Sequence, residues 1–197
     1  MDKHYLYIVL TRTNTGISKL IQIIKKDNYT HAAISLDREL DRMYSFGRRK
    51  TCNPFIGRFI KEDLNEGIYK SCKTIPGVII ELEVSRQQYQ SAKERIDHFI
   101  NNSNLYKYNY KGLLHCLLNK TAYSDDRFLC SEFVYYILEQ SGIADLKMSR
   151  NLVRPQNLLD IQGSIIYNGN LKELKLAKNM NLYNKQIQTR RMSEIYE

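Results

Sequence analysis

The stretch Phe128-Leu-Cys-Ser-Glu-Phe-Val-Tyr-Tyr-Ile-Leu138 decides the fold, because it joins a cysteine to the start of an apolar helix. Apolar residues such as Phe133 and Ile137 recur at helical spacing, and Gly142 is a typical helix end. Cys130 should therefore lie in the first turn of a buried helix. A thiol there faces unpaired backbone N–H groups and the positive end of the helix dipole, which both favour the thiolate. The alternative is a cysteine that is simply buried, since free cysteine is among the most buried residue types.

Length and composition fit one domain followed by a tail. A chain of 197 residues that is 43% hydrophobic is long and apolar enough to form a globular core. No apolar run approaches the length of a membrane span, and Tyr5–Leu10 is too short for a signal sequence, so we expect a cytoplasmic protein. We expect the domain over residues 1–171 and a basic C-terminal tail over residues 172–197.

The cysteines and the net charge restrict the chemistry further. Cys52, Cys72, Cys116 and Cys130 have neither the paired spacing of a zinc site nor the density of a disulfide scaffold. We therefore expect reduced thiols, no metal and no cofactor. The formal charge of +9 favours anionic surroundings such as nucleic acid, lipid headgroups or acidic polymers, and the basic tail is the segment expected to meet such a surface.

A histidine begins the second informative stretch. The sequences His31-Ala-Ala-Ile-Ser-Leu36 and Met43-Tyr-Ser-Phe-Gly47, joined by a charged turn, predict a hairpin of two strands. Small residues around the histidine leave room for another element, and a strand holds a catalytic group rigidly. The alternative is a structural histidine satisfied by a neighbour. Alternation in an antiparallel pair predicts one small, polar face made of His31, Ala33, Ser35, Met43, Ser45 and Gly47.

The rest of the chain predicts further strands and helices in an α+β fold. Residues 48–76 are interpreted as an irregular segment with a short helical piece over Arg58–Leu64. Asn168-Gly169 within Ile165–Leu171 predicts a hairpin with a tight turn. Hydrophobic periodicity also predicts strands at Tyr5–Thr11 and Val78–Val84 and helices at Ile17–Lys26, Arg86–Asn101, Leu113–Leu118 and from Pro155 onward.

The order of these features resembles the circularly permuted papain-like hydrolases, a superfamily that includes NlpC-type and YiiX-type proteins. The resemblance lies in Tyr-Thr-His31-Ala-Ala-Ile, then Phe-Leu-Cys130-Ser-Glu-Phe-Val-Tyr-Tyr, then Arg-Pro155-Gln-Asn-Leu. In element order it covers Tyr5 to Asp160. It implies an antiparallel sheet or half-barrel packed against a helix that carries a cysteine nucleophile.

The resemblance also implies three site residues. Such a family uses a thiol nucleophile, an imidazole base and a polar residue that orients the imidazole, which here correspond to Cys130, His31 and Ser45. Serine departs from the usual carboxylate or histidine, because it cannot stabilise an imidazolium with a full charge. The other candidates for the third partner are Glu132, Asp37, Tyr44 and a backbone carbonyl.

The predicted reaction is hydrolysis of an amide or ester bond through an acyl-enzyme. The substrate would be a small peptide or an acylated or lipid-like molecule. The backbone N–H of Cys130 would stabilise the oxyanion, and Tyr5 or Tyr7 is a candidate for a further hydroxyl. Two other functions are open: a papain-like ligand-binding module without catalysis, and a basic protein that binds nucleic acid or a membrane surface.

Overall fold

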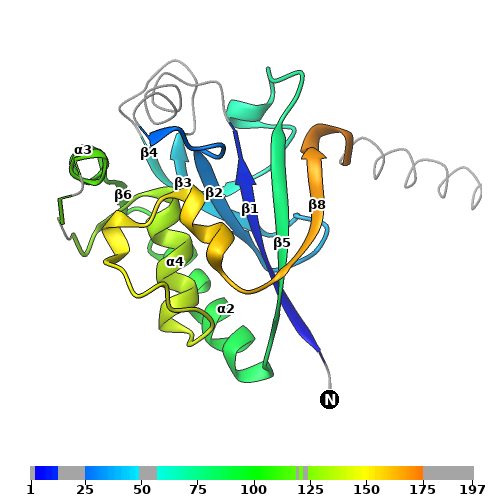
Figure 1. The fold of residues 1–197 in the computed structure, drawn as a ribbon. Coiled ribbons are helices and arrows are strands. Elements are labelled where there is room, and N and C mark those ends of the chain that lie inside the picture. Colours follow the sequence, from blue (N-terminus) through cyan, green and yellow to red (C-terminus); the bar gives the residue numbers. More distant parts are fainter. Residues whose placement is uncertain (1–2, 13–24, 49–56, 119, 122–123, 175–197) are drawn as a thin grey trace, which may run out of the picture.

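The computed structural model describes residues 3–12, 25–48, 57–118, 120–121 and 124–174. Within these residues an eight-stranded sheet forms the centre, in the order β7-β6-β4-β3-β2-β1-β5-β8 (Figure 1). All neighbouring strands pair antiparallel except β6 and β7, and a few helices pack against the sheet. The predicted α+β class is confirmed at this level.

The elements have the following bounds. The strands are β1 His4–Thr11, β2 His31–Ser35, β3 Met43–Arg48, β4 Gly57–Glu62, β5 Pro76–Val84, β6 Lys107–Tyr108, β7 Arg127–Phe128 and β8 Ser164–Asn170. The α-helices are α2 Arg86–Asn101, α3 Tyr110–Leu117 and α4 Cys130–Gln140, and the 3-10 helices are η1 Gly67–Tyr69, η2 Arg150–Leu152 and η3 Pro155–Asp160. Most of the predicted helix Ile17–Lys26, and the predicted tail beyond residue 174, lie outside the described residues.

Alternate residues of the central strands bury two hydrophobic clusters on opposite faces of the sheet. On β1, Leu6 and Ile8 enter the first cluster, whereas Tyr7 and Val9 enter the second. Helices α2 and α4 lie side by side over the face of the first cluster (Figure 1). None of the helices in the described part of the chain has the length and apolar character needed to cross a membrane.

Helix α4 begins at Cys130, as the sequence predicted. Its inner side chains, including those of Phe133 and Ile137, are fully buried against the sheet. Ser141 follows the last helical residue, and Gly142 then has a φ of 65°. This left-handed conformation suits glycine, because a residue with a Cβ is strained there. The predicted end of the helix is therefore confirmed.

Strands β2 and β3 form the predicted hairpin. Ile34 pairs with Tyr44 and Ser35 pairs with Met43. The apolar residues Ile34 and Tyr44 belong to the first hydrophobic cluster. The predicted small, polar face therefore points to the other side of the sheet.

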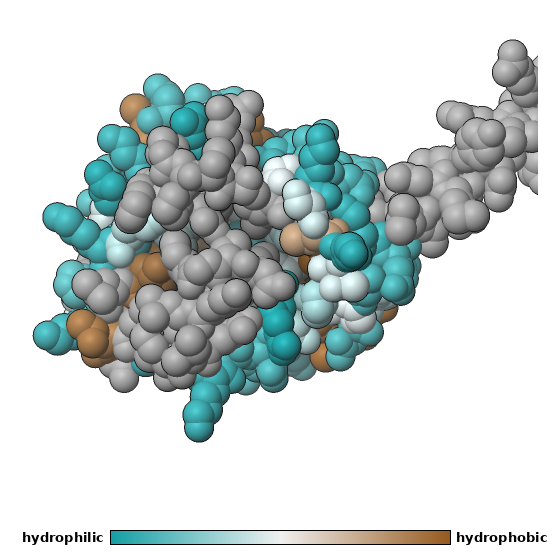
Figure 2. Space-filling view, turned by 90° about the horizontal axis from the view of Figure 1, so that it is seen from above, coloured by the Kyte–Doolittle hydropathy of each residue, from teal (hydrophilic) through white to brown (hydrophobic). Residues whose placement is uncertain are grey.

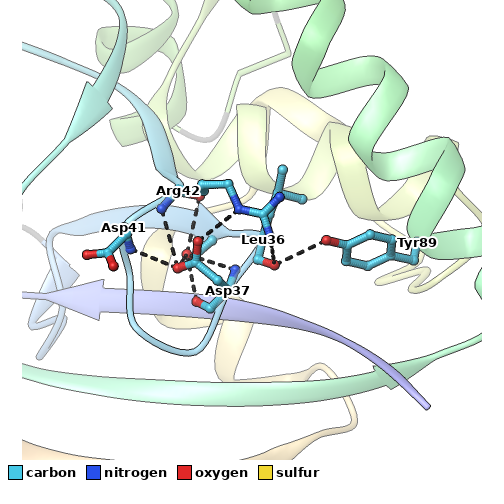
Figure 3. A network of polar contacts seen from close by, with 6 residues as sticks. Leu36, Asp37, Asp41, Arg42 and Tyr89 are labelled. Atoms are coloured by element: carbon cyan, nitrogen blue, oxygen red, sulfur yellow. Dashed lines mark hydrogen bonds and ion pairs between the residues drawn. The ribbon is translucent and has the colours of Figure 1, made fainter. Parts of the chain in front are cut away.

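The turn of this hairpin is fixed by one carboxylate. Asp37 Oδ1 accepts a hydrogen bond from the backbone N–H of Asp41 at 2.7 Å, and Asp37 Oδ2 accepts one from Arg42 Nε at 2.9 Å (Figure 3). Tyr89 on α2 donates its hydroxyl to the carbonyl of Leu36 at 3.2 Å. The turn is therefore attached to α2, and the register of β2 and β3 is set at this end.

The predicted helical piece over Arg58–Leu64 is wrong, because Gly57–Glu62 is strand β4. It pairs with β3 along all six residues. Phe59 and Glu62 are buried three positions apart, which imitates a helical repeat. In the strand they point to opposite faces, with Phe59 in the first cluster and Glu62 toward His31. A strand buried on both faces lacks simple alternation.

The hairpin predicted at Ile165–Leu171 is also wrong. Ser164–Asn170 is the single strand β8, which pairs antiparallel with β5. Gly169 lies opposite Gly77 in this pair, so the Asn-Gly sequence continues the strand instead of turning it. The predicted strands within β1 and β5 and the helix Arg86–Asn101 are confirmed, and Pro155 begins η3 as predicted.

Candidate active site

The two residues predicted to form a catalytic pair lie together. His31 begins β2 opposite Thr11, the last residue of β1, and α4 packs on β2 and β3 with Cys130 at its start. The Cys130 thiol is close enough to the His31 imidazole to raise the pKa of His31, by its charge and by hydrogen bonding. Both residues are buried, with 6% and 7% of their surface exposed. Folding thus joins a helix terminus and a strand that are far apart in the sequence.

The imidazole has a carboxylate as its partner on the other side. His31 Nε2 lies 2.8 Å from Glu62 Oε1, and the Glu62 side chain is only 2% exposed. Ser45 donates its hydroxyl to the same oxygen at 2.5 Å and lies 3.4 Å from His31 Nε2. The predicted third residue Ser45 is therefore at the site, but its shorter contact is with the carboxylate that holds the imidazole.

The small face around His31 provides the space for this carboxylate. Glu62 pairs with Met43 across β3 and β4, so its side chain falls on the same face as Ser45. A Cβ at Gly47 would lie 3.3 Å from Glu62 Oε1 and 3.5 Å from Ser45 Oγ. Gly47 therefore leaves the room that the sequence predicted, and the carboxylate of Glu62 occupies it.

A tyrosine contacts the second oxygen of the carboxylate. The hydroxyl of Tyr69, at the end of η1, donates to Glu62 Oε2 at 3.4 Å and lies 3.2 Å from Thr11 Oγ1. The Tyr69 ring presents its edge to His31, with ring centroids 6.5 Å apart. Tyr69 and Thr11 are both buried. Glu62 is thus held at both oxygens by side chains from β2, β3 and η1.

The charges in this network favour the ionised pair. Burial alone would lower the pKa of His31, but the negative charges of Glu62 and Cys130 raise that pKa well above its ordinary value. Burial would raise the pKa of Glu62, but His31, Ser45 and Tyr69 lower it below its ordinary value. Burial and the Glu62 charge raise the pKa of Tyr69, so its hydroxyl stays a donor. His31 Nε2 is the ring nitrogen that faces Glu62.

The other candidates for the third partner are engaged elsewhere. Asp37 holds the turn between β2 and β3 (Figure 3). Tyr44 packs in the first hydrophobic cluster. Glu132 Oε2 accepts from the backbone N–H of Leu129 at 3.1 Å, and Glu132 Oε1 lies 3.1 Å from Arg150 Nε. Glu132 therefore serves the N-terminus of α4.

The tyrosines of the first strand are far along β1 from the imidazole, since Tyr7 lies opposite Ser35 of β2 whereas Thr11 lies opposite His31. Tyr7 is buried in the second hydrophobic cluster, where burial and the charge of Glu81 raise its pKa to about 12. Tyr5 packs against the same cluster. The hydroxyl that joins the candidate site comes instead from Tyr69.

Glu62 and Tyr69 are the site residues that the sequence did not reveal. Both follow from the segment that was interpreted as irregular with a helical piece. Had Gly57–Glu62 been recognised as a strand with Phe59 on the apolar face, alternation would have put Glu62 on the face of His31. Tyr69 had no comparable signal, because it follows a turn and is the last residue of a single turn of 3-10 helix.

A polar hollow adjoins the carboxylate side of the site. Its volume is about 480 Å³, and Glu62 and Tyr69 line it together with charged residues of β4 such as Arg58 and Lys61. In the view from above, hydrophilic residues make up most of the described surface (Figure 2). Within the described ranges, no group of three or more His, Cys, Asp or Glu side chains is arranged to hold a metal ion.

Comparison of the chain with protein-family models, with curated proteins and with solved structures gave no match. Evidence about function therefore comes from the residues and their geometry. The central features are a buried thiol at a helix N-terminus, an imidazole and a carboxylate.

Proposed function

We propose that the protein is a thiol hydrolase of the permuted papain-like type that cleaves an amide or ester bond through an acyl-enzyme. Cys130 is the nucleophile, His31 the base, and Glu62 the residue that orients His31. One observation carries the proposal: the buried His31 imidazole is paired with the carboxylate of Glu62 at 2.8 Å and is influenced by the thiol of Cys130 at the start of α4. The substrate is a small peptide or an acylated or lipid-like molecule.

The arrangement of elements supports the permuted papain-like fold. A helix with a cysteine at its first position packs on a largely antiparallel sheet, and the histidine strand precedes that helix in the chain. The Arg-Pro155-Gln-Asn-Leu stretch then follows the helix and forms η3. The types of these elements and their order along the chain therefore support the sequence resemblance.

At rest His31 already holds the proton of Cys130, and in the first half of the reaction the thiolate attacks the carbonyl carbon. Negative charge moves to the carbonyl oxygen. The first N–H groups of α4 have no acceptor within the helix, so the N–H of Cys130 can stabilise this oxyanion. The imidazolium then gives its proton to the leaving amine or alcohol, and a thioester on Cys130 forms.

In the second half, His31 removes a proton from water, and the hydroxide attacks the thioester carbonyl. Collapse of the tetrahedral intermediate releases the acid product and the thiolate, which regains the ion pair with the imidazolium. Glu62 stays ionised throughout, because its charge compensates the imidazolium that forms in each half. Ser45 and Tyr69 keep the carboxylate in place by donating to its oxygens.

The test is selective alkylation by iodoacetamide at neutral pH, with the labelled cysteine identified by mass spectrometry. We expect Cys130 of the parent to react preferentially, and labelling at this position to be lost in Cys130→Ala. His31→Ala should slow labelling of Cys130 about 10- to 30-fold, because only the thiolate is alkylated and an unassisted thiol is a few per cent ionised at neutral pH. Cys116→Ala is the matched control, because Cys116 is buried and burial raises the pKa of its thiol.

Two results would contradict the proposal. One is a parent in which Cys130 reacts no faster than a free cysteine in a peptide. The other is a Cys130 whose reactivity is the same with and without His31. A second test uses nitrophenyl esters and thioesters as substrates. Intact-mass measurement after incubation should detect the acyl group on Cys130 of the parent but not on Cys130→Ala.

A further inference from the structure

The segment that precedes His31 is attached to the segment that follows α4. Arg154 Nη1 donates to both oxygens of Asp27, at 2.6 Å and 2.8 Å. Gln156 Oε1 accepts from the backbone N–H groups of Asn28 at 3.0 Å and Tyr29 at 3.4 Å. We refer to Asp27–Tyr29 and Arg154–Gln156 together as the clamp. Tyr29, the last residue of the first segment of the clamp, lies two positions before His31 in the sequence.

The other end of the clamp reaches the nucleophile. Ser131, the neighbour of Cys130, donates its hydroxyl to the carbonyl of Val153 at 2.6 Å. Ser131 and Val153 are both buried. Val153 directly precedes Arg154, so one hydrogen bond links the first turn of α4 to the clamp. These hydrogen bonds, together with the short stretches of backbone between them, therefore join the two halves of the candidate pair.

The clamp supplies contacts that depend on direction, which the hydrophobic packing of α4 does not. Helix α4 packs on the sheet through apolar side chains, and the hydrophobic effect has no directional preference. Hydrogen bonds, in contrast, depend steeply on distance and angle. A small shift of α4 along the sheet would stretch the hydrogen bond from Ser131 to Val153 and, through the adjoining chain, the bonds of Arg154 and Gln156. These bonds therefore restrict the position of the sulfur relative to the imidazole.

We propose that Arg154 and Gln156 are positioning residues that set the geometry between Cys130 and His31, an inference that rests on the proposed function. The clamp touches neither the thiol nor the imidazole in any hydrogen bond of the described residues. It acts through the backbone of Asn28 and Tyr29 on one side and through Val153 on the other. Arg154 and Gln156 of the Arg-Pro-Gln sequence would thus position the catalytic pair, a role that the sequence alone did not indicate.

Gln156 allows a matched pair of substitutions. Gln156→Glu keeps an oxygen that accepts from the two N–H groups, whereas Gln156→Met has a similar length without a strong acceptor. Arg154→Met is a second disruption that removes the charge opposite Asp27, whose carboxylate is buried. If Arg154→Met does not fold, the two variants of Gln156 still give the test.

The measurement is the rate constant for alkylation of Cys130 by iodoacetamide across pH, made on variants whose folding is verified by circular dichroism. We expect Gln156→Met to react about 3- to 10-fold more slowly than the parent at neutral pH, because a weaker contact with His31 leaves less of the sulfur as thiolate, the form that is alkylated. At high pH, where a thiol ionises without help, its rate should return to that of the parent. Gln156→Glu should keep the parent profile.

The outcomes separate this inference from the proposed function. A parent in which Cys130 is no more reactive than a free thiol contradicts the proposed function itself. A reactive parent that depends on His31, together with an unchanged profile in Gln156→Met and Arg154→Met, overturns only the role of the clamp. Equal losses in Gln156→Met and Gln156→Glu also overturn it, because the acceptor oxygen would then be irrelevant.

Discussion

Glu62 provides a full negative charge at the position where the sequence suggested a serine. A carboxylate stabilises an imidazolium more strongly than a hydroxyl does, since hydrogen bonds between ionised groups are the stronger ones. A buried carboxylate without partners would take up a proton. Glu62 avoids this because His31, Ser45 and Tyr69 all contact its oxygens. Ser45 is therefore part of the candidate site, but its short hydrogen bond goes to Glu62 and not to the imidazole that it was predicted to orient.

At this scale the charge of Glu62 can be tested directly. The negative charge of Glu62 raises the pKa of His31. Glu62→Gln should therefore lower the pKa of His31, so that its imidazolium loses the proton at a lower pH than in the parent. A titration of the His31 ring protons by NMR measures the midpoint. Ser45→Ala is the control, since it removes a donor but keeps the carboxylate charge. Equal midpoints in the parent and Glu62→Gln would show that the carboxylate does not control the imidazole.

At the scale of elements, the first turn of α4 has its own support. Glu132 accepts from the N–H of Leu129 and pairs with Arg150, whose guanidinium stacks 4.9 Å from the centroid of the Phe128 ring. Glu132 and Arg150 are both largely buried. This ion pair fixes the residue before Cys130, which favours a structural role for Glu132.

Removal of the Glu132 carboxylate should therefore reduce stability more than reactivity. Breaking a buried ion pair by deleting one partner typically costs about 3–5 kcal/mol, so we expect Glu132→Ala to lower the free energy of unfolding by this amount. Glu132→Gln should lose less, because its amide oxygen still accepts from Leu129. Urea denaturation measures the loss, and alkylation of Cys130 in the folded fraction should stay near the parent rate. A large loss of reactivity without loss of stability would instead make Glu132 a member of the catalytic network.

The elements that the sequence predicted are those whose patterns are local. The helix Arg86–Asn101 repeats its apolar residues within its own length, and the hairpin of β2 and β3 closes over a short turn. Strand β4 was missed because its burial on both faces reflects neighbours from β3 and the helices. Strand β8 was missed because Asn168-Gly169 suits a tight turn equally well, and only the distant β5 converts it into a strand.

The same distinction applies to the candidate site. Cys130 and His31 carry local signals, a helix start and a small-residue strand, so the sequence predicts both as candidates. Glu62 carries none, because its environment is created by β3 and by the histidine strand. If Gly57–Glu62 is assigned as a strand, alternation predicts that Glu62 lies on the same face of the sheet as His31. The clamp could not be anticipated, since it joins backbone N–H groups to a side chain from a distant segment.

At the scale of the whole molecule, three separate segments must converge before any chemistry is possible. The histidine comes from β2, the carboxylate from β4 and the thiol from α4. Sheet pairing fixes the first two relative to each other, because β2, β3 and β4 are consecutive neighbours. The third depends on how α4 packs, and there the polar contacts of Ser131 and the clamp add direction.

The buried pair of His31 and Glu62 also links global stability to pH. The raised pKa of His31 adds stability that is complete below the unfolded value of about 6.5 and is lost as pH rises through the folded pKa. The lowered pKa of Glu62 adds stability that is complete above the unfolded value of about 4.3 and is lost as pH falls through the folded pKa. Both contributions are therefore complete together only between about pH 4.3 and pH 6.5.

A variant that lacks both charges, His31→Gln with Glu62→Gln, makes this window measurable. The difference in the free energy of unfolding between the parent and this double variant should be largest inside the window and should shrink on both sides. A tenfold change in the protonation equilibrium of one group corresponds to about 1.4 kcal/mol, which urea denaturation resolves. Titrations of groups that do not contact this pair cancel in the difference because both proteins share them. A difference that stays constant from acid to alkaline pH would mean that the two groups are not ionised as a pair in the folded protein, and the electrostatic basis of the proposed mechanism would fail with it.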